Sequence, residues 1–316
     1  MAARPTVVIA RRLPEAGLEL LSERFEVEMP GPGASDGWLQ DHVRGAAAIV
    51  ADPSIAVDAA LLDAAGPALQ VVSNFGVGYD NIDLKAARAR GVQATNTPDV
   101  VTNSTAELAV ALMLAAARRI AEADAFIRAD RWSRGGSEQF LGRDLAGATV
   151  GLIGFGRIGQ RVAQRLDGFA VQLLVYAEQL PPTLGAARSC QLPELLAASD
   201  FVSLHVPLTP QTRHLIDAHA LSLVKPGAIL VNTSRGGVVD TSELIAALAS
   251  GRLAAAGLDV YEDEPDVPAQ LRALPNTVLL PHIGSATVTT RDAMARLCAE
   301  NVIAVIDGRR PPTPVG

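Results

Sequence analysis

The sequence predicts an α/β protein with two Rossmann-like or flavodoxin-like domains, each built on a parallel sheet, and a cleft between them. Three observations predict this fold class. The 316 residues are about twice the ~150 of one domain. Short β-branched runs alternate with helical stretches along the chain, which is typical of parallel sheets covered by helices. A glycine-rich turn, Gly154 to Gly159, joins a strand pattern to a helix pattern.

The first part of the chain, up to Pro98, reads as one α/β series. Pro98 ends it, because the residue before a proline disfavours helix. The strand patterns are Thr6 to Ala10, Ala47 to Val50, Leu69 to Ser73 and Val92 to Thr95, and the helix patterns are Pro14 to Glu23, Asp58 to Ala65 and Asp83 to Ala89.

A long apolar helix follows, with Ser104-Thr-Ala-Glu107 as a capping-box pattern at its start. Helical character extends to about Asp130, and the Gly135-Gly136 pair then breaks into a loop. This stretch is too apolar for a solvated spacer. We therefore expect the helix and the loop around Trp132 to form the interface of a homodimer.

A second α/β series begins at Thr149 and predicts one doubly wound sheet of six parallel strands. The segment from Thr287 to Asp307 is helical again and returns to complete the first domain. We therefore expect a discontinuous first domain of residues 1–98 plus 286–316, into which a second, Rossmann-like domain of residues 99–285 is inserted. The six strand patterns are Thr149 to Ile153, Val171 to Val175, Phe201 to Leu204, Ala228 to Val231, Ala254 to Val260 and Val278 to Leu280.

The composition excludes several classes of function. With 27 basic and 34 acidic residues the net charge is −7, so we expect neither a nucleic-acid nor a membrane partner. The longest uncharged apolar stretch, Leu108 to Ala117, is about half of the ~20 residues that a membrane span needs. No signal peptide is evident and Cys190 and Cys298 build no disulfide framework, which predicts a cytoplasmic protein. No histidines and cysteines have metal-ligand spacing, so we expect no metal.

The glycine-rich turn has the flanks that a dinucleotide site requires. Gly154 would make the tight turn, Gly156 would let backbone N–H groups approach a pyrophosphate, and Gly159 would let the helix pack on the strand. Arg157 and Ile158 open the helix, whose N-terminus would face the anion. The alternative is a strand–helix turn that merely tolerates glycine.

Cofactor choice is predicted from the end of the next strand. Glu178 follows Gly154 at close to the ~20 residues expected for a carboxylate on the adenosine ribose. No arginine or lysine occurs between Gln172 and Ala187, so a 2′-phosphate would find no cation there. NAD (NADH) is therefore favoured over NADP. The alternative for Glu178 is a surface residue in a proline-rich loop.

Three polar residues follow the ends of predicted strands, where ligands bind in open parallel sheets. Arg235 can fork onto a carboxylate, His282 can donate a proton near neutral pH, and Glu264 can keep that histidine charged. This set suits the reduction of a carbonyl next to a carboxylate by a nicotinamide hydride. The alternatives are a phosphate ligand for Arg235, a solvated acidic run for Glu264 and a loop histidine for His282, with His205 as its rival.

Five ordered motifs make the chain resemble the D-isomer-specific 2-hydroxyacid dehydrogenases, the family of glyoxylate, hydroxypyruvate and D-phosphoglycerate enzymes. The resemblance implies NAD(H)-dependent reduction of a small 2-oxoacid, of the glyoxylate or hydroxypyruvate type, to the D-2-hydroxyacid, and the reverse. The motifs are Asn74-Phe-Gly-Val-Gly78-Tyr-Asp-Asn-Ile-Asp83, Gly154 to Gly159, Asn232-Thr-Ser-Arg235-Gly, Asp259-Val-Tyr-Glu-Asp-Glu264-Pro and Pro281-His282-Ile-Gly-Ser285-Ala-Thr.

The resemblance also implies roles: residues 1–98 plus 286–316 would be the substrate (catalytic) domain, and residues 99–285 would be the NAD-binding Rossmann domain. Arg235 would orient and polarise the oxoacid, His282 would be the acid–base and Glu264 would hold it, while the backbone of Val77 and Gly78 would receive the substrate carboxylate near Ser285. Asp259 would bind the nicotinamide carboxamide. The other cofactor contacts would come from Thr105, Gly154, Gly156, Arg157, Ile158, Gly159, Glu178, Val206, Pro207, Thr212, Thr233, Ser234, His282 and Gly284.

Departures from the family patterns restrict the range of expected substrates and cofactors. Ala177 stands where many NAD-using members have aspartate, and the acid comes one place later at Glu178. The loop Asp52-Pro-Ser54 lacks the arginine of phosphoglycerate dehydrogenases, which disfavours a phosphorylated substrate, and Glu264 argues against a formate dehydrogenase. Two alternatives remain: an NAD-sensing binding protein like the C-terminal-binding-protein corepressors, and a phosphonate (phosphite) dehydrogenase, although no lysine lies beside Gly76-Val77-Gly78.

Overall fold

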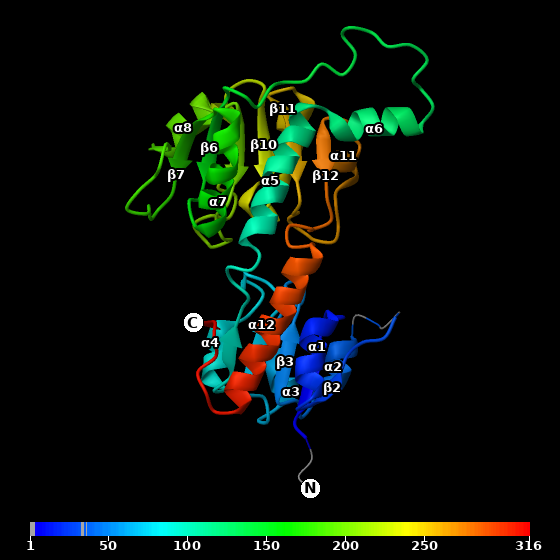
Figure 1. Cartoon of the computed structure of the whole chain (residues 1–316), viewed down its shortest axis with the longest axis vertical. Coiled ribbons are helices and arrows are strands. Elements are labelled where there is room, and N and C mark those ends of the chain that lie inside the picture. Colours follow the sequence, from blue (N-terminus) through cyan, green and yellow to red (C-terminus); the bar gives the residue numbers. More distant parts are fainter. Residues whose placement is uncertain (1–3, 33–34, 36) are drawn as a thin grey trace. The chain divides into compact units, whose positions relative to one another are not determined.

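The computed structural model describes residues 4–32, 35 and 37–316, and the chain divides into two compact units (Figure 1). Unit 1 comprises Met1–Val101 and Ser285–Gly316, and unit 2 comprises Thr102–Gly284. Each unit contains a sheet of parallel strands with helices on both faces, and among the described strands only one short strand of unit 1 runs antiparallel. The predicted α/β class with two parallel sheets is confirmed.

The sheet of unit 1 has the flavodoxin-like strand order β13-β5-β4-β3-β1-β2. Every pair is parallel except β13 with β5. The sequence analysis missed β2, which has only three residues, two of them charged, and β13, which has only two. The strands are β1 (Thr6–Ile9), β2 (Glu26–Glu28), β3 (Ala48–Ala51), β4 (Val71–Asn74), β5 (Gln93–Thr95) and β13 (Pro314–Val315).

Two apolar clusters join the helices of unit 1 to its sheet. On one face α1 and α12 pack together so closely that a Cβ on Gly17 would lie 2.4 Å from the carbonyl oxygen of Ala295. Helix α12 therefore packs within unit 1. The helices are α1 (Glu15–Ser22), α2 (Trp38–His42), α3 (Ala59–Ala65), α4 (Leu84–Ala89) and α12 (Val288–Ile306).

The sheet of unit 2 has seven parallel strands in the order β12-β11-β10-β9-β6-β7-β8. The order reverses between β6 and β9, which is where doubly wound sheets bind ligands. The prediction of six strands missed β8, an exposed pair of residues. The strands are β6 (Thr149–Ile153), β7 (Gln172–Tyr176), β8 (Arg188–Ser189), β9 (Phe201–Leu204), β10 (Ala228–Asn232), β11 (Leu253–Leu258) and β12 (Thr277–Leu279).

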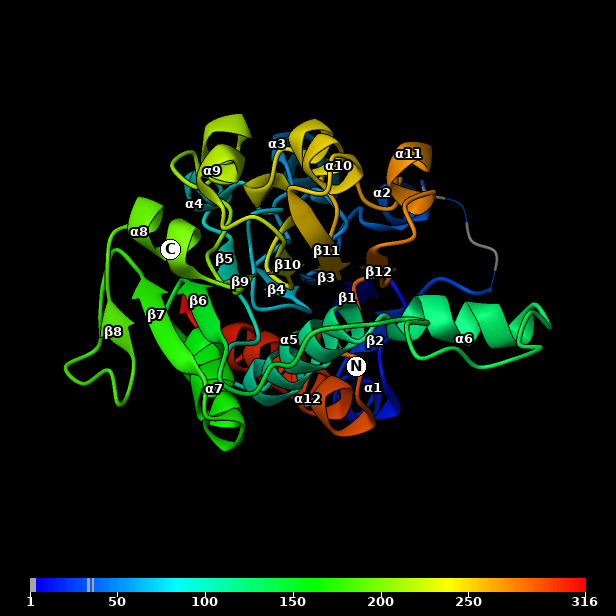
Figure 2. The ribbon, with the colours of Figure 1, turned by 90° about the horizontal axis from the view of Figure 1, so that it is seen from above.

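Helices α5 and α7 cover one face of this sheet, and α8, α9 and α10 cover the other (Figure 2). Within the described part of the chain, no helix is both long and apolar enough to cross a membrane. The helices are α5 (Thr102–Ala117), α6 (Ile120–Arg128), α7 (Arg157–Leu166), α8 (Leu192–Ala198), α9 (Ala218–Leu223), α10 (Thr241–Ala249) and α11 (Ala269–Arg272).

The predicted start of the long helix is wrong. Helix α5 begins at Thr102, so Ser104 lies inside it, and the carboxylate of Glu107 accepts a hydrogen bond from Arg165 at 2.8 Å instead of capping the helix. The helical stretch also breaks at Arg119, whose left-handed backbone (φ 55°) separates α5 from α6. Helix α5 places Leu112 and other side chains in the core of unit 2, whereas α6 has no buried residue.

Candidate active site

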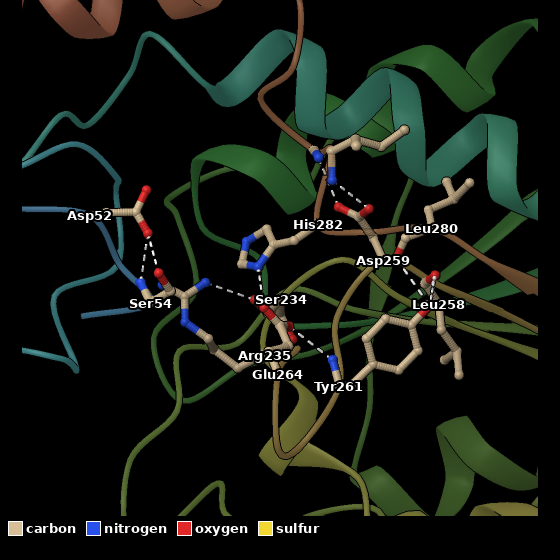
Figure 3. A network of polar contacts seen from close by, with 12 residues as sticks. Asp52, Ser54, Ser234, Arg235, Leu258, Asp259, Tyr261, Glu264, Leu280 and His282 are labelled. Carbon is tan, nitrogen blue, oxygen red and sulfur yellow. Dashed lines mark hydrogen bonds and ion pairs between the residues drawn. The ribbon is translucent and has the colours of Figure 1, made fainter. Parts of the chain in front are cut away.

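The predicted catalytic residues lie on loops at the carboxyl edge of the unit 2 sheet (Figure 3). Arg235 follows β10, Glu264 follows β11 and His282 follows β12. These three strands are neighbours and parallel, so their carboxyl ends meet at one edge. The structure therefore gathers side chains that are far apart in the sequence.

His282 and Glu264 form a direct pair. The imidazole Nδ1 lies 2.7 Å from Oε2 of Glu264, and the backbone N–H of Tyr261 donates to Oε1 at 2.9 Å. Burial raises the pKa of Glu264, but the hydrogen bond and charge of His282, together with the Tyr261 N–H, outweigh it, so this pKa lies below its ordinary value. Glu264 is thus a carboxylate at neutral pH. With Nδ1 bound to it, Nε2 of His282 is the ring nitrogen available for proton exchange.

Two further residues hold this pair in place. The hydroxyl of Tyr261 donates to the carbonyl of Leu280 at 3.0 Å, so one residue orients Glu264 through its N–H and fixes the chain before His282 through its ring. Asp259 is buried and accepts from the N–H groups of Ile283 and Gly284, both at 2.7 Å. Burial raises the pKa of Asp259 against these two hydrogen bonds. The sequence analysis missed the role of Tyr261, which depends on contacts between loops.

Arg235 is fixed by the turn that carries it. The side-chain amide of Asn232 donates to the carbonyl of Arg235 at 2.9 Å, and the guanidinium donates to the carbonyl of Ser234 at 2.9 Å. The next residue, Gly236, touches the neighbouring loop, because a Cβ there would lie 1.8 Å from the carbonyl carbon of Tyr261. This contact brings the charge of Arg235 close enough to help lower the pKa of Glu264.

The glycine-rich turn joins β6 to α7 at the point where the strand order reverses. Gly154 has a φ of +96°, and a Cβ there would lie 2.6 Å from the carbonyl of His205. At Gly159 a Cβ would meet the carbonyl oxygen of Gly154 at 2.3 Å. At Gly156, directly before α7, a Cβ would meet nothing within 4 Å. The turn is therefore tight on its inner side and open at the helix N-terminus, which suits an anion.

Several further predicted cofactor residues of unit 2 follow the ends of β7, β9 and β10. Thr212 closes the turn after β9 by donating to the carbonyl of Pro207 at 2.6 Å, and Val206 packs against the core. Glu178 is exposed two residues beyond β7. Thr233 Oγ1 is buried and has no hydrogen-bond partner in the described residues, as expected of a group that meets a bound molecule.

Three residues that were predicted to contact the cofactor form hydrogen bonds within the protein. Thr105 donates to the carbonyl of Gly284 at 3.2 Å, Ser234 donates to Oδ1 of Asn232 at 2.8 Å, and the carboxylate of Asp259 holds the His282 loop. These residues shape the site through the backbone. Arg157 is the exposed first residue of α7, and Ile158 packs on the core.

The other histidines are unsuited to the acid–base role. Burial lowers the pKa of His205 to about 4, so it is neutral near pH 7. His42 and His219 are exposed, as predicted. The side chain of His214 is 37% exposed, and its Nε2 lies 2.6 Å from Oε1 of Glu262.

The acidic run from Glu262 to Glu264 and the two cysteines lie outside the predicted acid–base pair or, in the case of Glu264, belong to it. A solvated acidic run was the alternative interpretation for Glu264; within that run, Glu262 accepts from Thr241 at 3.1 Å and contacts His214 at 2.6 Å. Burial raises the pKa of the Cys190 thiol, and it raises that of Cys298 to about 12, so both stay protonated. Across the described residues, no cluster of three or more histidine, cysteine or carboxylate side chains is arranged to hold a metal ion.

The predicted substrate residues Val77, Gly78 and Ser285 belong to unit 1. Val77 and Gly78 lie on the loop after β4, and their carbonyl oxygens accept hydrogen bonds from Asn96 and Asn74 at 2.7 and 2.6 Å. Asn74 lies in a motif of the sequence, but its contact with Gly78 could not be predicted from that motif. Ser285 is the residue at which the chain re-enters unit 1.

Comparisons with known proteins agree with this arrangement. The sequence model of a family described as "D-isomer specific 2-hydroxyacid dehydrogenase, NAD binding domain" matches residues 110–284. Glyoxylate reductase of Thermococcus onnurineus is 48% identical over 319 residues, which cover 98% of this chain and 95% of the relative.

Two solved structures are similar over nearly the whole chain. The TT0316 protein of Thermus thermophilus has a TM-score of 0.92 and 45% identity, covering 98% of this chain and all (100%) of the other. An NADPH-dependent glyoxylate/hydroxypyruvate reductase of Sinorhizobium meliloti, in complex with NADP and malonate, has a TM-score of 0.88 and 36% identity, covering 99% and 97%. With a matching family model and relatives of this identity and coverage, the chain belongs to the D-isomer specific 2-hydroxyacid dehydrogenase family.

Proposed function

We propose that this chain is an NADH-dependent reductase of small 2-oxoacids, of the glyoxylate or hydroxypyruvate type, that forms the D-2-hydroxyacid and catalyses the reverse reaction. The observation that carries the proposal is the 2.7 Å contact between His282 and Glu264 at the sheet edge that also carries Arg235. The curated relative from Thermococcus onnurineus, a glyoxylate reductase, supports the choice of substrate class.

The reaction needs a hydride at the carbonyl carbon and a proton at the carbonyl oxygen. The bound nicotinamide cofactor supplies the hydride. His282 gives its Nε2 proton to the oxygen as negative charge develops there, and Glu264 stabilises the imidazolium before that transfer. Arg235 binds the oxoacid with two parallel N–H groups and polarises its carbonyl. In the reverse direction the neutral imidazole accepts the hydroxyl proton.

The proposed carboxylate site lies on unit 1. The N–H groups of Val77 and Gly78 would receive the substrate carboxylate, with Ser285 near it. Under this proposal unit 1 serves as the substrate domain and unit 2 as the cofactor domain. No basic side chain of the Asp52–Ser54 loop is required, since the substrate carries no phosphate.

The residues present fit a nicotinamide dinucleotide. The open N-terminus of α7 at Gly156 and Arg157 would hold the pyrophosphate, with Gly154, Ile158 and Gly159 shaping the turn. The remaining contacts would come from Glu178 on the ribose, and from Thr105, Val206, Pro207, Thr212, Thr233, Ser234, Asp259, His282 and Gly284 around the rest of the cofactor.

The preference for NADH over NADPH is part of the proposal. It is supported by exposed Glu178 and by the lack of lysine or arginine from Gln172 to Ala187. Arg188, the first basic residue after this stretch, is paired with Glu194 at 2.7 Å. Because the Sinorhizobium meliloti structure contains NADP, the preference needs its own measurement.

We further infer a homodimer and a cytoplasmic location. Helix α6 and the segment after it expose apolar side chains, with Ile127, Trp132 and Leu141 at 52%, 65% and 64% of their surface. Leu141 also lines a groove of about 360 Å³, together with Ile229 and Val278. A second copy of the chain would cover these surfaces. Both cysteines are free, in line with a reducing compartment.

A panel of substrates tests the proposal. Purified protein is assayed with glyoxylate, hydroxypyruvate, pyruvate and phenylpyruvate, each with NADH and NADPH, and the product is resolved on a chiral column. We expect the highest kcat/KM with glyoxylate or hydroxypyruvate and NADH, and the D-isomer wherever the product is chiral. No turnover with any pair would contradict the activity, and a higher kcat/KM with NADPH would contradict the role of Glu178.

A further inference from the structure

Three consecutive carbonyl groups on the loop after β4 are held from within unit 1. The carbonyl of Gly76 accepts from the backbone N–H of Thr97 at 2.9 Å. The next two, of Val77 and Gly78, accept from the side-chain amides of Asn96 at 2.7 Å and Asn74 at 2.6 Å. All three donors lie at the carboxyl ends of β4 and β5, so the three carbonyls point toward the sheet.

This arrangement decides where the N–H groups of the loop point. In a planar trans peptide the C=O of one residue and the N–H of the next are antiparallel. The N–H groups of Val77, Gly78 and Tyr79 therefore point away from the sheet. Within the described part of unit 1, none of the three has a hydrogen-bond acceptor. Successive free N–H groups of this kind form an anion-binding concavity.

The two asparagines are themselves buried and braced. Asn74 is 0% exposed and Asn96 6% exposed, where an amide without partners would be costly. Asn74 forms a reciprocal amide pair with Asn81, at 3.1 and 3.2 Å. Asn81 also donates to the carbonyl of Ile55 at 3.0 Å, which ties the pair to the loop after β3. A rigid polar network thus lies directly beneath the three peptides.

We propose that Asn74 and Asn96 are positioning residues that give this enzyme its selectivity for a carboxylate next to the carbonyl. They do so by fixing the peptides after Gly76, Val77 and Gly78, which makes the Tyr79 N–H a third donor beside those of Val77 and Gly78. This inference rests on the proposed carboxylate site. Neither asparagine touches the substrate; each acts through the carbonyl that it holds.

The test separates substrate binding from the chemical step. Asn96→Ala and Asn74→Ala each release one peptide of the loop, so we expect the KM for glyoxylate to rise roughly tenfold or more, as for the loss of a hydrogen bond to a charged group. We expect kcat at saturating glyoxylate to stay within about twofold, and NADH binding measured by fluorescence to stay unchanged, because the chemistry and the cofactor contacts are untouched. A KM increase confined to the oxoacid is not expected from a general loss of stability.

Glyoxal provides the second readout, because it has an aldehyde in place of the carboxylate. The wild type should prefer glyoxylate to glyoxal in kcat/KM, and both variants should lose most of that preference. The matched control is Asn276→Ala, since its amide also holds two backbone carbonyls, of Leu248 and Ala254, but in unit 2 and away from the site. This control should lower the melting temperature without changing the preference.

The outcomes separate this inference from the proposed carboxylate site. If the wild type prefers glyoxylate and both variants keep its KM and its preference, the asparagine inference is overturned and the carboxylate site stands. If the wild type reduces glyoxal as well as glyoxylate, the carboxylate site itself is wrong. Should an alanine variant fail to fold, Asn96→Ser and Asn74→Ser, which keep a small polar side chain without the amide, are assayed in the same way.

Discussion

His282 is the residue on which the proposed chemistry depends. Because the alkoxide that forms on hydride transfer needs a proton, His282→Ala should lower kcat by about 10²- to 10⁴-fold, the usual cost of removing a proton donor. NADH affinity should change little, as measured by fluorescence titration. His219→Ala, which removes an exposed histidine, is the control and should keep wild-type turnover. Near-normal turnover of His282→Ala would refute the mechanism.

Removing the charge of Glu264 should change the pH dependence of kcat/KM. The lowered pKa of Glu264 keeps it charged across the neutral range, where the carboxylate can pair with the imidazolium that donates the proton. Glu264→Gln keeps the shape and removes the charge, so the alkaline limb of the kcat/KM profile for oxoacid reduction should move to lower pH. Profiles of both proteins from pH 5 to 10 check this. An unmoved limb would show that Glu264 only orients the ring.

Because His205 is buried and its pKa is lowered, the stability of the protein should depend on pH. This pKa is lowered by burial from 6.5 to about 4 in the folded state, so the unfolded chain binds a proton first as the pH falls. The free energy of unfolding should therefore decrease between pH 6.5 and 4, by on the order of 3 kcal/mol from this group. Urea unfolding of the cofactor-free protein checks it. His205→Leu should remove most of this slope, and a slope equal to that of the wild type would contradict the assignment.

At the scale of elements, the β6–α7 turn contains one glycine that the fold requires, Gly154, and one that is proposed to approach the cofactor, Gly156. Gly154→Ala puts a Cβ against His205 at a positive φ, so it should destabilise the protein by roughly 1–3 kcal/mol. Gly156→Ala meets nothing in the protein, so its stability should stay near that of the wild type while NADH affinity falls. Urea unfolding and NADH titration measure the two effects. Equal NADH affinity in Gly156→Ala and the wild type would remove the pyrophosphate from this turn.

A helix or strand could be predicted from the sequence where the interactions that define it join residues close together in the chain. Asp58 and Asp83 accept hydrogen bonds from Leu61 and Ala86 at the starts of α3 and α4, and those starts were predicted from the sequence. Helix α5 begins at Thr102, two residues before the serine of the capping-box pattern, so its predicted start was wrong. The two-residue strands β8 and β13 exist only through their partners, and no periodicity can appear in two residues.

The residues of the candidate active site could likewise be predicted only where their positions follow from the sequence nearby. Arg235, Glu264 and His282 could be proposed from the sequence because each follows a recognisable strand, and parallel strands bring their ends together. The role of Asn96 could not be proposed, because its amide reaches a carbonyl on a loop 19 residues away in the sequence. The pairing of His214 with Glu262, 48 residues apart, has the same character. Such contacts become visible only when the loops are placed.

For the whole molecule, the exposed side chains of α6 and the following loop predict a dimer. Sedimentation at micromolar concentration should give twice the mass of the chain. Trp132→Glu with Leu141→Glu should shift the protein to monomer, because both side chains are largely exposed in the single chain and a charge there is costly only in an interface. A stable wild-type monomer would contradict the dimer.

The division of the chain also has a consequence for synthesis. Unit 2 is one uninterrupted segment and can fold as soon as Gly284 leaves the ribosome. Unit 1 is begun first and finished last, since α12 completes the cover of a sheet face that contains Val7, Ile9 and Val50. Unit 2 can thus be complete before unit 1, and the earliest strands of the chain are the ones that need a chaperone's protection the longest.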